Sequence, residues 1–119
     1  MTTPRMRKVN SVLREIIAEE VERMSDSRLE LVSITGVDTA PNLRTALVYV
    51  DSLGDDQEGV IEALKAAAYR IQRSIGRQVR MKYTPVLDFQ IDPGVVAGER
   101  IDNILRSLRA EDDTTEEEE

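Results

Sequence analysis

The amino-acid sequence predicts a single α+β domain, in which helices pack on one face of a three-stranded sheet. Three observations favour this class. The chain has 119 residues, enough for one modest hydrophobic core. In two long segments its apolar residues recur at the spacing of a helix. In three short segments the apolar residues have the density or the alternation typical of strands. Aromatic residues make up only 3%, so the core must be aliphatic.

A first helix is predicted to begin at Thr3-Pro4, because threonine caps helices well and proline is tolerated at the first helical position. We expect about twenty helical residues, ending near Ser25 and Asp26. Spacings of three and four place the apolar residues of this segment in one stripe: Val9, Val12, Leu13, Ile16, Ile17, Val21 and Met24.

An antiparallel hairpin is predicted next. The segments LELVSITGV (29–37) and LRTALVYVD (43–51) are rich in the β-branched and apolar residues that strands favour. The link between them, DTAPN, contains a proline and two residues with Asx-type side chains, and this composition is typical of a turn.

A second helix is predicted from about Gln57 to Gln78, with Asp55 or Asp56 as its N-cap. Gly76 lies inside this helix and is expected to weaken or bend it, because glycine lowers helix stability by about 1 kcal/mol relative to alanine. At about 100° per residue one sector of the helix is apolar: Leu64, Ala68, Ile71, Ile75 and Val79. The opposite side gathers Arg70, Arg73, Arg77 and Arg80.

From Met81 the period changes to two, which predicts a third strand. Pro85 cannot donate to a strand ladder, so this strand is expected at an edge or with a bulge. One face holds Met81, Tyr83, Leu87, Phe89 and Ile91, and the other holds Lys82, Thr84, Asp88, Gln90 and Asp92.

The C-terminal part is predicted to contain a turn at Asp92-Pro93-Gly94 and a short final helix. The helix is suggested by the spacing of Ile101, Ile104, Leu105 and Leu108. We therefore expect one folded domain over residues 1–110, without internal repeats.

The last residues, EDDTTEEEE (111–119), are expected to form a disordered acidic tail, because a block of like charges repels itself and buries nothing. Seven of the 23 acidic residues lie there, which leaves 16 acidic against 16 basic residues in the predicted domain. The tail either keeps the protein in solution or regulates it by shielding a basic surface.

Several function classes are disfavoured by what the sequence lacks. It has no cysteine and no histidine, so disulfides, thiolate chemistry, most zinc sites and most general-base catalysis are excluded. The serines have no histidine to activate them, and Gly94 and Gly98 are not followed by the lysine of a phosphate loop. We expect no enzymatic activity, metal or cofactor. The N-terminus lacks a secretory apolar stretch, and no run approaches the roughly 20 residues of a membrane span, so we expect a cytoplasmic protein.

The basic residues are the strongest functional feature. Residues 69–82 carry five cations, and no acid occurs between Glu62 and Asp88, although a merely solvated surface normally mixes both signs. Arginine donates to phosphate in pairs, and backbone contact supplies affinity rather than sequence reading. The few aromatic residues argue against stacking on single strands. We therefore predict binding of structured RNA by Arg5, Arg7, Lys8, Arg70, Arg73, Arg77, Arg80 and Lys82. A basic stripe that only solvates the helix is the alternative.

Four stretches within residues 5–108 carry a family resemblance: RMRKVNSVLREIIAEEV, SDSRLELVSITGVDTAPNLRTALVYV, SIGRQVRMKYTPVLDFQID and GERIDNIL. Through them the chain resembles bacterial ribosome-binding factor A. The last two are the most specific, with Pro85 before a Leu-Asp-Phe strand and Gly98 before a helix.

This resemblance implies a type II KH-like fold, in the order α-β-β-α-β with a kinked second helix. It implies transient binding to the free small (30S) ribosomal subunit during late maturation of 16S rRNA, support of 5′-end processing and of growth in the cold, and release by a ribosome-dependent GTPase. We expect a monomer. The family's kink usually carries Ala-x-Gly, but Ala67, Ala68 and Tyr69 stand here, so the kink is expected to be milder or shifted toward Gly76.

Two other readings use the same basic helix. One is a protein-interaction module that recruits its partner at an exposed sheet edge. The other is a ribosome-associated stress or initiation factor of similar size.

Overall fold

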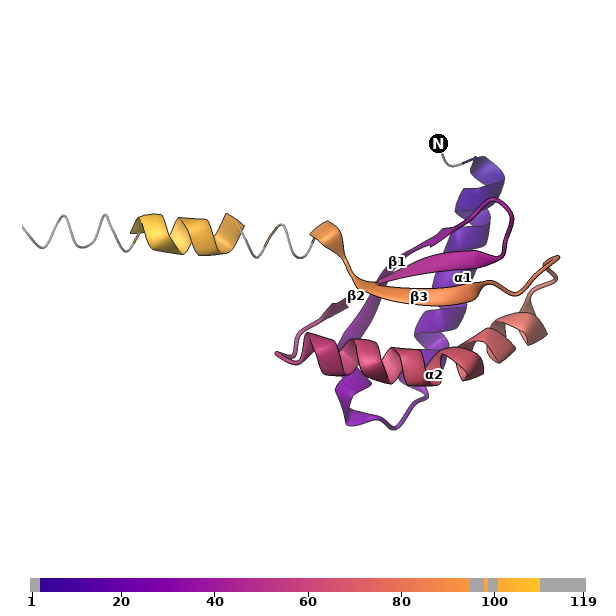
Figure 1. The fold of residues 1–119 in the computed structure, drawn as a ribbon, viewed down its shortest axis with the longest axis horizontal. Coiled ribbons are helices and arrows are strands. Elements are labelled where there is room, and N and C mark those ends of the chain that lie inside the picture. The colour runs from indigo at the N-terminus through magenta and orange to yellow at the C-terminus, as the bar shows by residue number, and fades with distance from the viewer. Residues whose placement is uncertain (1–2, 95–97, 99–100, 110–119) are drawn as a thin grey trace, which may run out of the picture.

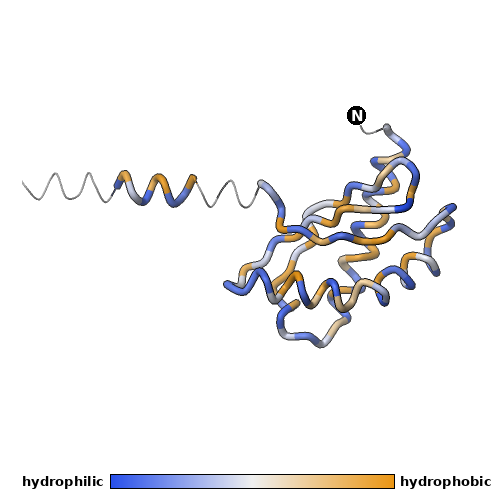
Figure 2. The backbone as a smooth tube through the Cα atoms, viewed as in Figure 1, coloured by the Kyte–Doolittle hydropathy of each residue, from blue (hydrophilic) through white to orange (hydrophobic). Residues whose placement is uncertain are grey.

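The structure is a computed structural model that describes residues 3–94, 98 and 101–109. Two long helices, α1 and α2, cover one face of a three-stranded sheet, and the other face of the sheet is open (Figure 1). The apolar residues of the strands and of both helices are shown in Figure 2, and the core lies between the helices and the sheet. The predicted α+β class and the order α-β-β-α-β are confirmed.

Helix α1 spans Pro4–Glu22, and Thr3 is its N-cap as predicted. The Thr3 hydroxyl accepts a hydrogen bond from the backbone N–H of Met6 at 3.2 Å. The predicted apolar stripe faces the core, where its central members are buried: Leu13, Ile16, Ile17 and Val21. The helix ends earlier than expected, with Arg23 as its C-cap.

Strands β1 (Val32–Thr39) and β2 (Thr45–Ser52) pair antiparallel, so the predicted hairpin is confirmed. Both strands begin later than expected. Residues Ser27–Leu29 form a short 3₁₀ helix, η1, because Asp26 caps it by accepting from the Arg28 N–H at 3.0 Å. Leu29 is buried in the core, but it belongs to this 3₁₀ helix and not to a strand.

Helix α2 spans Gln57–Gln78, with the predicted bounds, and Asp56 is its N-cap. The Asp56 carboxylate accepts from the Gly59 N–H at 2.9 Å. In Figure 1 the C-terminal part of α2 is inclined to its first part, in agreement with a kinked second helix. The chain leaves the helix at Val79, whose φ of −128° is extended. Arg80 therefore lies beyond α2, and the prediction of one four-arginine helical stripe is wrong at that position.

Strand β3 (Val86–Ile91) pairs parallel with β2 and lies at the edge of the sheet, where Pro85 led us to expect it. Leu87 and Phe89 are buried while Asp88 and Gln90 are exposed, which confirms the predicted register. The strand does not start at Met81, as the alternating pattern had suggested. Residues 79–85 instead form an irregular connection that ends at the buried Pro85.

The segment after β3 differs in part from the prediction. Pro93 and Gly94 are helical rather than a turn, and the Asp92 carboxylate precedes them and accepts from the Gly94 N–H at 2.8 Å. Residues 101–109 form the predicted final helix (yellow in Figure 1), and their side chains are exposed. The predicted acidic tail, residues 111–119, lies outside the described residues. Within the described ranges, no helix has the length and hydropathy needed to cross a membrane.

Candidate nucleic-acid interface

Three of the predicted arginines lie together on α2. Arg70, Arg73 and Arg77, with Tyr69 of the same helix and Glu20 of α1, line an open hollow of about 450 Å³. The Arg73 guanidinium carbon lies 5.9 Å from the centre of the Tyr69 ring, and Tyr69 is 72% exposed. Residues Tyr69, Arg70, Arg73 and Arg77 are called the α2 cluster below.

One member of the α2 cluster also holds the two helices together. The Glu20 side chain is only 6% exposed, and its Oε1 accepts from Nε of Arg70 at 2.8 Å. Arg23 approaches the other carboxylate oxygen at 3.6 Å. The hydrogen bond from Arg70 lowers the pKa of Glu20 below its ordinary value, against the opposing effect of burial. The Arg70 side chain remains 56% exposed, so it can reach a ligand while it pairs with Glu20.

A second group of predicted cations comes from segments that are far apart in the sequence. Arg5 of α1 and Arg80 and Lys82 of the α2–β3 connection line an open hollow of about 700 Å³. Because α2 ends at Gln78, Arg80 does not continue the arginine row of the helix. It lines the same hollow as Arg5. We call Arg5, Arg80 and Lys82 the end cluster.

The remaining predicted cations have less defined positions. Arg7 and Lys8 are exposed on the first turns of α1 but do not line either hollow. Of the eight predicted RNA-binding residues, only Arg70 forms an ion pair within the described ranges. The N-terminal basic region also includes Arg14. Its Nε donates to the Ile34 carbonyl at 3.1 Å, beside the irregularity in β1, so this residue supports the fold.

Sequence reasoning missed an aromatic residue between two cations. The Arg44 guanidinium carbon lies 4.3 Å from the centre of the Tyr83 ring, and its NH2 group donates to the Tyr83 hydroxyl at 3.1 Å. Nζ of Lys82 lies 5.6 Å from the centre of the same ring. Tyr83 had been assigned to the inner face of a strand, but it lies in the irregular connection before β3. The local pairing of Lys82 with Tyr83 was the one indication in the sequence.

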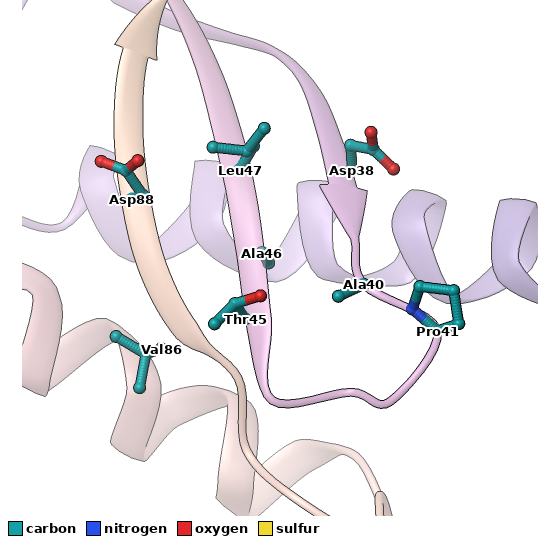
Figure 3. A pocket seen from close by; sticks show the side chains of 8 residues that line it. All are labelled: Asp38, Ala40, Pro41, Thr45, Ala46, Leu47, Val86 and Asp88. Carbon is teal, nitrogen blue, oxygen red and sulfur yellow. The ribbon is translucent and has the colours of Figure 1, made fainter.

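The open face of the sheet has a different character. A hollow of about 410 Å³ there is lined by apolar groups, among them Leu47 and Val86, and by the carboxylates of Asp38 and Asp88 (Figure 3). Carboxylates repel phosphate, so this face is a poor phosphate-binding surface. The cations that suit phosphate lie on the α2 cluster and the end cluster.

The chemistry of these groups suits the binding of polyanions. The arginines supply paired donors from exposed positions. No group of three or more acidic side chains that could hold a metal ion is present in the part of the chain that the structure describes.

Comparison with known proteins identifies the family of this chain. A family model described as ribosome-binding factor A matches residues 5–105. Ribosome-binding factor A of Rubrobacter xylanophilus is 45% identical over 114 residues, which cover 94% of this chain and 93% of that protein. The protein of the same name from Geobacter sulfurreducens is 34% identical over 110 residues, covering 90% and 93%.

Solved structures show the same similarity. The crystal structure of ribosome-binding factor A from Thermus thermophilus matches with a TM-score of 0.69 and 29% identity, covering 72% of this chain and 94% of that one. A homology model of the Thermus thermophilus factor, fitted into a cryo-electron-microscopy map of a 30S complex, matches with a TM-score of 0.60 and 31% identity, covering 68% and 88%. The chain therefore belongs to the ribosome-binding factor A family.

Proposed function

We propose that this chain binds the small (30S) ribosomal subunit through the α2 cluster and the end cluster, as a binding protein without catalytic activity. The observation that carries the proposal is the gathering of predicted RNA-binding cations around two hollows. Among the described residues, Glu20 is the only acid that lines either hollow. The related Thermus factor has been fitted into a map of a 30S complex, which supports the same partner here.

The chemistry of the two clusters indicates how such binding works. Each cation that neutralises an RNA phosphate releases a counterion, so affinity is large at low salt and falls as salt rises. Contacts of this kind position the protein on the backbone without reading the sequence. Recognition then depends on the shape of the folded rRNA, which has to present phosphates to both clusters at once.

We also propose the role that family membership suggests. The chain associates transiently with free small subunits, assists late maturation and 5′-end processing of 16S rRNA, supports growth in the cold, and leaves with the help of a ribosome-dependent GTPase. It acts in the cytoplasm as a monomer. Residues 1–110 carry the ribosome-binding function, and the acidic residues 111–119 keep the protein in solution or shield the basic clusters.

Sedimentation of cell lysate in sucrose gradients, at low and at moderate salt, tests this proposal. We expect the protein with free 30S subunits, and we expect moderate salt to release it. A protein found with whole ribosomes would act as a stress or initiation factor. A protein found in neither fraction at low salt would be an adaptor for other proteins, and the proposal would be wrong.

A further inference from the structure

The hollow at the end of α2 combines apolar walls with the end cluster. Three separate segments form it: the first turns of α1, the loop between β1 and β2, and the connection from α2 to β3. Besides the cations, the hollow is lined by Thr3, Met6, Val9, Pro41, Leu43, Val79 and Met81. Its volume of about 700 Å³ lies within the range of small-ligand sites, roughly 300–1,000 Å³.

Among the described residues, the charged side chains that line this hollow are all basic. Arg5, Arg80 and Lys82 line it, no carboxylate does, and none of the three forms an ion pair within the described residues. Unpaired cations that only keep a surface hydrated do not need an apolar hollow between them. A ligand that fits both features has an anionic group and a flat apolar body.

The backbone of Leu43 is a second, independent observation. Its φ of 64° is the only positive value at a non-glycine residue within the described ranges. Branched apolar side chains rarely adopt this conformation, and such strain is concentrated at ligand-binding positions. The turn is held by the Leu43 N–H, which donates to the Ala40 carbonyl at 2.8 Å, and by the Arg44 N–H, which donates to the Asn42 side chain at 3.0 Å. The loop thus holds an apolar side chain at the hollow where glycine or asparagine would fit the backbone better.

An aromatic ring lies near one cation of the hollow. Lys82 lines the hollow and also lies 5.6 Å from the centre of the Tyr83 ring. The Arg44 guanidinium lies over the same ring and donates a hydrogen bond to its hydroxyl group. Cations beside an aromatic ring are a combination with which proteins hold unpaired nucleotides.

We propose that this hollow binds one unpaired nucleotide of the RNA. The base lies against the apolar walls formed by Met6, Leu43 and Met81, and its phosphate lies among the end cluster. This proposal rests on the proposed function. It adds selection for an unpaired position in an otherwise folded RNA, which the α2 cluster does not provide. Contacts with the paired parts of the RNA are made by the α2 cluster.

Binding of the full chain to two RNA hairpins tests the proposal. The hairpins share one sequence, but one carries a single bulged 2-aminopurine and the other is fully paired. We expect the wild-type chain to bind the bulged hairpin about tenfold tighter, a difference of about 1.4 kcal/mol. The fluorescence of the bulged base should change on binding and saturate with the same affinity.

Two variants change residues that line the hollow, and one control variant changes the α2 cluster. Leu43→Gly removes a wall and suits the positive φ, so the fold should persist while the tenfold preference is lost. Met6→Glu places a carboxylate in the first turn of α1, where helices tolerate acids, and should have the same effect. Arg73→Glu combined with Arg77→Glu should weaken binding of both hairpins equally and leave the preference unchanged.

Equal binding of both hairpins by the wild-type chain would overturn the inference while leaving the proposed function intact. A tenfold preference that survives in both hollow variants would overturn it as well. Free adenosine monophosphate binding as tightly as the bulged hairpin would show a free-nucleotide site instead. If the wild-type chain binds neither hairpin and no 30S subunit, the proposed function itself fails, and the inference with it.

Discussion

The buried carboxylate of Glu20 accepts a hydrogen bond from Arg70, with 2.8 Å between Oε1 and Nε. This bond links the core side of α1 to the basic surface of α2. The two residues lie 50 positions apart in the sequence. Arg70 therefore serves the packing of the two helices as well as the proposed RNA interface, whereas Arg73 and Arg77 are exposed and free of ion pairs within the described residues.

Glu20→Gln should destabilise the domain at neutral pH by about 1–3 kcal/mol, because it removes the charge from a buried, hydrogen-bonded pair. Urea unfolding of both proteins at pH 7 measures the difference. Glu19→Gln, at the exposed neighbouring position, is the matched control and should change the free energy of unfolding by less than about 0.5 kcal/mol.

The same pair predicts a pH dependence. The folded-state pKa of Glu20 lies below its ordinary value of about 4.3, so the pair stabilises the fold above that pH. This contribution is lost as the pH falls through the ordinary value toward the folded-state pKa. The difference in stability between the wild type and Glu20→Gln should therefore shrink below about pH 4. A difference that stays constant from pH 7 to pH 3 would show that the carboxylate charge is not what stabilises the pair.

Phe89→Ala should destabilise the domain by about 3–5 kcal/mol, because Phe89 is 3% exposed in the core and its truncation leaves a cavity. Val86→Ala is the control on the same strand, since Val86 is 60% exposed and should cost little. Thermal unfolding measures both. Similar melting temperatures for the two variants would contradict the position of Phe89 in the core.

Gly76→Ala should stabilise the domain by up to about 1 kcal/mol, because glycine is a poor helix former. An added Cβ would lie 3.3 Å from the Thr84 hydroxyl, and Thr84 is an exposed residue in the irregular connection, so it can move away. Combining the change with Thr84→Ala should give the full gain. Loss of stability in both variants would show that α2 requires glycine at this position.

Deletion of residues 111–119 should tighten RNA binding slightly at low salt and change little at high salt. Seven acidic residues are removed, and their repulsion of phosphate acts within a Debye length of about 10 Å at 0.1 M salt. Binding of 30S subunits at two salt concentrations measures the effect. Substantially weaker binding after the deletion would mean that the segment itself contacts the subunit.

Much of the fold could be predicted from local patterns. The bounds of α2 follow from Asp56 as a cap and from the apolar period, and the burial of Phe89 follows from strict alternation. The start of β1 was misplaced because Leu29 and Leu31 look like strand residues, whereas Asp26 caps a 3₁₀ turn at that point. Alternation also continued by chance through residues 81–85, although the chain there is irregular.

The candidate site was predicted as a set of residues but not as an arrangement. The acid-free run pointed to the α2 cluster directly. No local pattern could show that Arg5 and Arg80 share a hollow, because this depends on how the ends of α1 and α2 meet. The pairing of Arg70 with Glu20 and the contact of Arg44 with Tyr83 are tertiary in the same way.

The salt dependence of 30S binding by Arg73→Glu combined with Arg77→Glu tests the central claim most directly. If the domain neutralises about four or five phosphates, log K should fall against log salt with a slope of about −3 to −4 for the wild type. The double variant should fold normally, bind far more weakly and show a slope flatter by about one to two. Arg→Lys at both positions should cost less, because the charge remains and only the paired donors are lost. A folded double-Glu variant that binds 30S subunits with the wild-type affinity and slope would contradict the account.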